Sequence, residues 1–261
     1  MITYKELSKI EQIENLLTIS KCIHIAKEDF YMFSEEHLKF IVQSIANVFE
    51  VNFGIRVNFE VRIVNQRSIE DLPETLRNQG VINLAINEYD PCRFVYQLAH
   101  EMCHYYYFYV FDIPQKFRWF EETICELVSE LTLNILSKSW TGIKLFGMVS
   151  NNEVLKNYLQ KITITNAKNL NGEQLKYNTL ENHLERECYD RAVNTFFALK
   201  IFNSVKDTSL KSFFNDLRVF MHQLIINIDK GFIDNISVSS NRIKRVFGKI
   251  FIQDSYLYKV G

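Results

Sequence analysis

The sequence predicts an α+β fold, in which residues 1–140 combine helices with a small mixed or antiparallel sheet and residues 141–261 are mainly helical. Residues 56–63 alternate strictly between polar and apolar side chains, which is the pattern of a half-buried strand. A second short apolar strand is predicted at residues 81–87. Downstream of these strands almost the whole chain has helical periodicity, and no linker rich in serine, glycine and proline divides the two parts.

Residues that favour helix ends predict where the first helices begin. Residues up to about 30 have apolar side chains at helical spacing, and a second helix is expected to begin after Ser34, whose hydroxyl can cap it. Asp90 followed by Pro91 predicts the start of a third helix. An acid suits the capping position, and proline has no N–H to lose at the first helical position.

The overall composition is that of a folded soluble protein. The 261 residues carry 30 Lys and Arg against 31 Asp and Glu, so a dedicated nucleic-acid binder, which usually has a basic excess, is not expected. Charges at Lys5 and Glu6 argue against a signal peptide, and no apolar stretch reaches the length of about 18 residues that a membrane-spanning helix needs. The five cysteines form no CxxC pair and are expected to be free thiols of a cytoplasmic protein.

A metal-binding motif, His100-Glu101-Met102-Cys103-His104, lies in the helix predicted after Pro91. Histidines four residues apart share one helix face, so both imidazoles can bind a single ion, and Glu101 points to the side, where it can take a proton from water. The pattern also arises by chance in about one chain in a hundred of this length. The surrounding helix is apolar nearly all round, however, and buried titratable groups need a partner that a cation can supply. We therefore predict one Zn²⁺ ion bound by His100 and His104, with Glu101 as the general base.

The start of the next helix offers a third metal ligand. Glu122 and Glu126 are four residues apart and share a helix face, so Glu122 can bind the ion while Glu126 accepts the outer N–H of a ligand histidine. Glu121 points about a quarter-turn off that face and is the alternative ligand. These acids could also serve only to stabilise the N-terminus of the helix.

These residues resemble the motifs of the gluzincin metallopeptidases, which carry HExxH on one helix and a ligand glutamate on the next. In the aminopeptidase N-like branch of that family the glutamate lies in a Trp-x-x-Glu context, and Trp119-Phe120-Glu121-Glu122 matches it. Seventeen residues separate His104 from Glu122, close to the spacing in the family. The resemblance covers about residues 55–200. It implies a zincin-like catalytic domain with active-site helices, a cleft completed by the C-terminal helices, and zinc metallopeptidase activity.

The same resemblance implies a group that stabilises the transition state. The stretch Tyr189-Asp190-Arg191-Ala192 is similar to the one in which aminopeptidase N-like enzymes keep a tyrosine for this purpose. The O–H of Tyr189 would donate to the oxyanion that forms during hydrolysis. His183 would do a similar job in a thermolysin-like arrangement, and most of the 13 tyrosines are expected to serve packing, so both assignments stay open.

Substrate binding is predicted at the second strand. Zincins hold an extended substrate against an edge strand above the metal, a form of β-augmentation. The segment 83–87 is our prediction for that edge, with Asn83 and Ala85 as substrate-binding residues. The Gly-x-Met-Glu-Asn motif that grips a free amine in the aminopeptidase N-like enzymes is not present at residues 80–84, so aminopeptidase specificity is not implied.

The function predicted from the sequence is hydrolysis of a peptide bond in a peptide or protein substrate. Two alternatives from other classes remain. One is a catalytically inactive, zinc-stabilised binding or regulatory protein of zincin-like fold, and the other is a metal-free helical protein in which HExxH is a coincidence. Cys103 and Cys125 lie within the two motifs and thiolates bind zinc, but Cys103 is interpreted as a small buried apolar residue.

Overall fold

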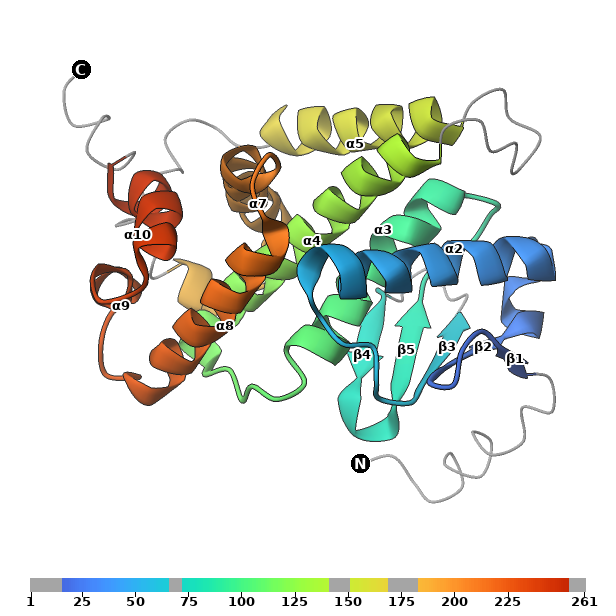
Figure 1. The fold of residues 1–261 in the computed structure, drawn as a ribbon, viewed down its shortest axis with the longest axis horizontal. Helices are drawn as coiled ribbons and strands as arrows, with labels where there is room; N and C mark the ends of the chain where they lie inside the picture. Colours follow the sequence, from blue (N-terminus) through green and yellow to red (C-terminus); the bar gives the residue numbers. More distant parts are fainter. Residues whose placement is uncertain (1–15, 66–71, 141–150, 169–182, 254–261) are drawn as a thin grey trace.

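The computed structural model describes residues 16–65, 72–140, 151–168 and 183–253. Figure 1 shows a small sheet at one end of the molecule and a group of helices at the other, with α4 (Arg118–Ser139) running between them. The described part is thus a mixed α+β protein with one small sheet, as the sequence predicted.

The sheet has five strands in the order β1-β2-β3-β5-β4. The three inner strands run parallel to one another, and the two outer strands each pair antiparallel with their neighbour. β5 is buried along its whole length because helices cover the sheet, which explains its continuous apolar character. The strands are β1 (Leu16–Thr18), β2 (Ile23–Ala26), β3 (Val61–Asn65), β4 (Glu74–Leu76) and β5 (Val81–Leu84).

Two capped helices pack near the sheet. Helix α2 (Glu35–Asn47) begins where predicted, and the Ser34 hydroxyl accepts the N–H of His37 at 3.2 Å. Helix α3 (Pro91–Met102) also begins where predicted, since Asp90 accepts the N–H of Arg93 at 2.9 Å and proline occupies the first turn. α3 contacts β5, β4 and α2, so it carries the HExxH motif past the sheet.

The remaining helices gather around α4. It packs against α3 on one side and against α5 and α7 on the other. Its first turn places Trp119 and Phe120 among aromatic rings of the C-terminal helices, including Phe220 and Phe232, which holds the start of α4 against those helices. These helices are α5 (Asn151–Lys168), α7 (Arg191–Val205), α8 (Leu210–Ile226), α9 (Phe232–Ser237) and α10 (Asn241–Phe247).

The helix predicted for residues up to about 30 is wrong where the structure describes it. Residues 16–18 and 23–26 form β1 and β2 instead, while residues 1–15 lie outside the described part. The alternation of Ile23 and Ile25 with His24 suits a strand, and β2 is held by parallel pairing with β3, far away in the sequence. The apolar pattern of these residues fits a helix as well as a strand, and pairing with β3 selects the strand.

The strand predicted at residues 56–63 begins later, at Val61. The carbonyl groups of Phe59 and Glu60 accept hydrogen bonds from the hydroxyls of Tyr106 and Tyr105, at 3.0 and 2.5 Å. The backbone here is therefore satisfied by side chains of the segment after α3 rather than by a neighbouring strand.

One continuous hydrophobic core joins the two predicted parts of the chain. It includes Ile25 and Ile63 of the sheet, Leu98 of α3, and Phe213 and Phe247 of the C-terminal helices. Within the described residues no helix has both the length and the apolar character to cross a membrane.

Glu130, in the middle of α4, has a buried carboxyl group without a hydrogen-bond partner among the described residues. Burial, and then the nearby charge of Glu126, raise the pKa of Glu130 well above its ordinary value of 4.5. The carboxyl is therefore neutral in the folded protein at pH values where it ionises in the unfolded chain.

We expect Glu130→Gln to change how stability depends on pH. Because the folded pKa is raised, the proton on Glu130 favours the folded state fully below the unfolded pKa, and this contribution is lost as pH rises through the folded pKa. Each unit of pKa difference corresponds to about 1.4 kcal/mol. Denaturant unfolding at pH 4 and pH 8, with the same metal content, should show a smaller fall in the free energy of unfolding for Glu130→Gln than for wild type. The exposed Glu153→Gln is the control, and equal falls in all three proteins would contradict the expectation.

Candidate metal centre

The two histidines of the motif meet near the end of α3. His100 lies in the last turn of α3, and His104 lies in the π-helical segment Cys103–Tyr107 that continues it. Their Nε2 atoms are 3.2 Å apart. Two imidazole lone pairs at this distance repel each other unless a proton or a metal ion lies between them.

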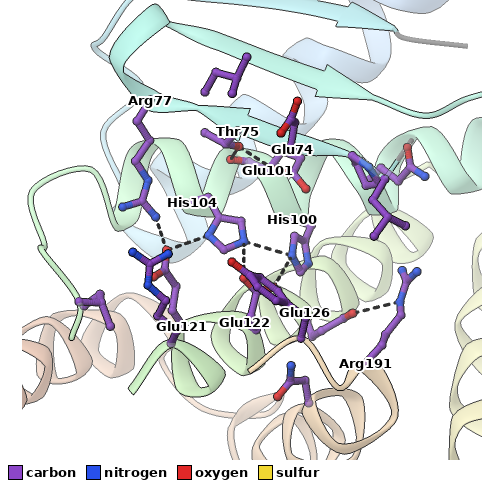
Figure 2. A pocket seen from close by; sticks show the side chains of 18 of the residues that line it. Glu74, Thr75, Arg77, His100, Glu101, His104, Glu121, Glu122, Glu126 and Arg191 are labelled. Carbon is purple, nitrogen blue, oxygen red and sulfur yellow. Dashed lines mark hydrogen bonds and ion pairs between the residues drawn. The ribbon is translucent and has the colours of Figure 1, made fainter. Parts of the chain in front are cut away.

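Glu122 of α4 faces both imidazoles. Its carboxylate oxygens are 3.4 Å from Nε2 of His100 and 3.5 Å from Nε2 of His104. Figure 2 shows the three side chains converging from α3 and α4. The predicted set of two nitrogen donors and one oxygen donor is thus brought together.

Glu121 holds the outer side of His104. Its Oε1 is 2.9 Å from Nδ1 of His104 and also pairs with the guanidinium of Arg77. A carboxylate only accepts hydrogen bonds, so Nδ1 carries a proton, and Nε2 is the ring nitrogen of His104 that could bind an ion. The supporting role that we predicted for Glu126 therefore belongs to Glu121.

Glu126 has other partners because of how the two helices run. It accepts a hydrogen bond from the hydroxyl of Tyr96, and its Oε1 is 3.5 Å from Nε of Arg191. α4 runs antiparallel to α3, so residues later in α4 lie beside residues earlier in α3. The hydrogen bond from the Ser129 hydroxyl to the backbone carbonyl of Tyr96 shows the same direction. Glu126 thus lies one turn beyond the histidines, and its predicted contact with them is wrong.

The charges around the imidazoles favour a cation. Burial alone would lower the pKa of His104, but hydrogen bonds with Glu121 and Glu122 outweigh burial and raise it. Burial likewise opposes ionisation of Glu122, yet hydrogen bonds to the two histidines hold the pKa of this carboxyl well below its usual range. One buried carboxylate, that of Glu121, and one half-buried carboxylate, that of Glu122, lie beside the two imidazoles and attract positive charge, either protons or a metal ion.

Cys125 is a further donor that the sequence motif did not assign. Ligand atoms of His100, His104 and Cys125 all lie within 4.8 Å of one another. Burial, followed by a hydrogen bond with the Cys103 thiol, raises the pKa of Cys125. Glu122 is part of the cleft wall, whereas Cys125 is not among the residues that line the cleft. Its position three residues after Glu122 was the available signal, because such residues share a helix face.

The expected general base has a fixed side chain. Glu101 is 3% exposed, and its Oε2 lies 2.7 Å from the hydroxyl of Thr75 on β4. The same hydroxyl lies 3.0 Å from the backbone carbonyl of Glu101. Among the described residues Oε1 has no hydrogen-bond partner, so this oxygen is available to a water molecule in the cleft. Sequence reasoning did not find Thr75, because its partner lies 26 residues away.

A cleft of about 920 Å³ opens over these residues. His100, Glu101, His104 and Glu122 line it together with β4 and the start of α7. Tyr189, with 68% of its surface exposed, is also in the cleft wall. His183, the alternative to Tyr189, is not in the described lining and lies 2.9 Å from Asp190 instead.

The strand predicted to form the sheet edge is an internal strand. β5 lies between β3 and β4, so Asn83 is buried, and the backbone N–H of Ala85 donates to Gln97 at 3.0 Å. The prediction of an exposed edge at residues 83–87 is therefore wrong. The outer strand on this side of the described sheet is β4, and its residues Glu74, Thr75 and Leu76 line the cleft. β4 was not predicted from the sequence because it is short and mostly polar, and an outer strand needs little apolar surface.

Comparisons of the chain with protein-family models, curated proteins and solved structures find no match. The resemblance to gluzincins therefore depends on the motif residues of the sequence alone.

Proposed function

We propose that the protein is a zinc-dependent metallohydrolase that cleaves peptide bonds. The observation that carries this proposal is the meeting of His100, His104 and Glu122 in one cleft with the carboxylate of Glu101 beside them. Nitrogen and oxygen donors in this combination, with a position left for water, are typical of catalytic zinc sites.

The chemical types of the donor atoms suit a zinc ion. The facing Nε2 lone pairs and the ionised Glu122 supply three ligands, and Glu121 fixes the tautomer of His104 that zinc requires. When bound, zinc polarises the scissile carbonyl and lowers the pKa of water.

The side chains of the chain itself have distinct tasks. Glu101 takes the proton of the attacking water at Oε1 and passes it to the leaving amine. Thr75 keeps the Glu101 carboxylate oriented through Oε2. Tyr189 is the proposed donor to the oxyanion, supported by its place in the cleft wall.

An extended peptide is the substrate that suits the cleft best. β4 is one of the two terminal strands of the described sheet, and its residues lie along the cleft with Glu101. A terminal strand offers backbone N–H and C=O groups that an extended peptide can pair with.

The test is hydrolysis of a mixed peptide library by the zinc-reconstituted protein, with products identified by mass spectrometry. The proposal expects new peptide termini with wild type that are absent with Glu101→Gln. If zinc-loaded wild type cleaves neither library peptides nor denatured proteins, peptide hydrolysis is not its function.

A zinc-stabilised binding protein without hydrolytic activity is the second candidate. The observation that favours it is the buried thiol of Cys125 beside the imidazoles, because a fourth protein ligand is typical of structural zinc sites. Such a protein would bind zinc, lose thermal stability in chelator, and be indifferent to Glu101→Gln in any binding assay.

A further inference from the structure

We propose that Cys125 is a fourth protein ligand of the metal, which binds through Sγ together with His100, His104 and Glu122. This inference rests on the zinc site of the proposed function and adds a sulfur donor to it. Ligand atoms of the two histidines and Cys125 lie within 4.8 Å of one another. Modest side-chain movement around a bound ion would bring all of them to bonding distance.

The helix geometry explains how α4 can supply two ligands. Glu122 and Cys125 are three residues apart, so their side chains point to the same side of α4. Glu122 contacts both imidazoles, and Cys125 follows it one turn deeper in the protein, with no exposed surface. The antiparallel packing of α3 on α4 keeps this face of α4 against the histidines.

Cys125 approaches the histidines from the core rather than from the cleft. The cleft wall includes His100, His104 and Glu122, whereas Cys125 is not among the lining residues. A sulfur ligand on the core side would leave the cleft side of the ion open to water. The proposed ligand is therefore compatible with hydrolysis, because catalytic zinc can expand to five ligands.

A second buried thiol, that of Cys103, lies close to Cys125. Cys103 has no exposed surface, and its thiol is near enough to that of Cys125 to contribute, after burial, to the raised pKa of Cys125. When Cys125 gives up its proton to bind a metal, the S–H of Cys103 can donate to the thiolate. Hydrogen bonds from such outer groups stabilise metal ligands.

A sulfur ligand has a consequence for metal choice. Thiolates favour soft and borderline ions such as Zn²⁺, whereas carboxylate and carbonyl oxygens suit Mg²⁺ and Mn²⁺. We expect Cys125→Ser to bind Zn²⁺ more weakly and to lose part of the preference for Zn²⁺ over Mn²⁺.

The test is X-ray absorption at the zinc edge of the full-length, zinc-loaded protein, with Co²⁺ substitution as a second probe. Wild type should show one sulfur at about 2.3 Å among nitrogen and oxygen ligands at about 2.0–2.2 Å, and its Co²⁺ form should have a thiolate-to-metal charge-transfer band. Both signals should vanish in Cys125→Ser. Cys103→Ser, which keeps a donor beside Cys125, is the matched control and should retain them.

Each outcome separates this inference from the proposed function. Zinc with only nitrogen and oxygen ligands in wild type would overturn the role of Cys125 and leave the His-His-Glu site in place. Sulfur signals that persist in Cys125→Ser but vanish in Cys103→Ser would also overturn it. Protein that binds neither Zn²⁺ nor Co²⁺ would overturn both proposals. If Cys125→Ser does not fold, the wild-type spectrum alone still decides.

Discussion

Glu101→Gln is expected to lower peptide hydrolysis by about 10²–10⁴-fold, the usual contribution of a general acid or base, while zinc content stays at the wild-type value. Glutamine has nearly the same shape and can keep a hydrogen bond with Thr75, but it cannot take a proton from water. Measuring kcat/KM for a library-derived peptide together with metal content separates the loss of the base from the loss of the ion.

A surface carboxyl serves as the control for Glu101. Glu88 is exposed in the loop before α3, and Glu88→Gln should keep wild-type activity and zinc. Full activity in Glu101→Gln would refute the proposed role of Glu101. Loss of zinc together with activity would mean that Glu101 supports the ion rather than the proton transfer.

Glu122→Gln and Glu121→Gln are expected to weaken zinc binding to different degrees. Glu122 faces both Nε2 atoms, so its variant loses a charged ligand and should bind zinc more than about 100-fold more weakly. Glu121 acts through Nδ1 of His104, and loss of such an outer partner typically costs about 10–100-fold in affinity. Competition with a chromophoric zinc chelator measures both affinities on one scale.

This pair of variants decides which glutamate binds the ion. The order of the two affinities is the informative result, because the residues are neighbours on one helix and each substitution removes one charge. A larger loss in Glu121→Gln than in Glu122→Gln would transfer the ligand role to Glu121.

The parts of the site that depend on one helix could be predicted from the sequence. His100 and His104 face each other because residues four apart share one side of a helix. The Trp-x-x-Glu motif predicted that Glu122 lies opposite them. The partner of the outer histidine nitrogen could not be predicted in this way. It depends on how α4 crosses α3, and the antiparallel crossing gives that place to Glu121 and moves Glu126 to Tyr96.

The same division holds for the fold. Ser34 and Asp90 marked helix starts because capping is a contact between near neighbours in the sequence. The order of the strands could not be predicted, since the pairing of β2 with β3 and of β5 with β4 depends on contacts between distant segments. For that reason the outer strand was assigned to Asn83 and Ala85 of the β5 region rather than to the short polar strand that carries Thr75.

The proposed metal site is tested most simply by elemental analysis of the purified full-length protein for bound metal. We expect about one zinc ion per chain after reconstitution and dialysis, because one set of His-His-Glu ligands defines one site. If the protein retains no zinc or other divalent metal under these conditions, the proposed metal site is wrong, and a shared proton would explain the short distance between the two histidines.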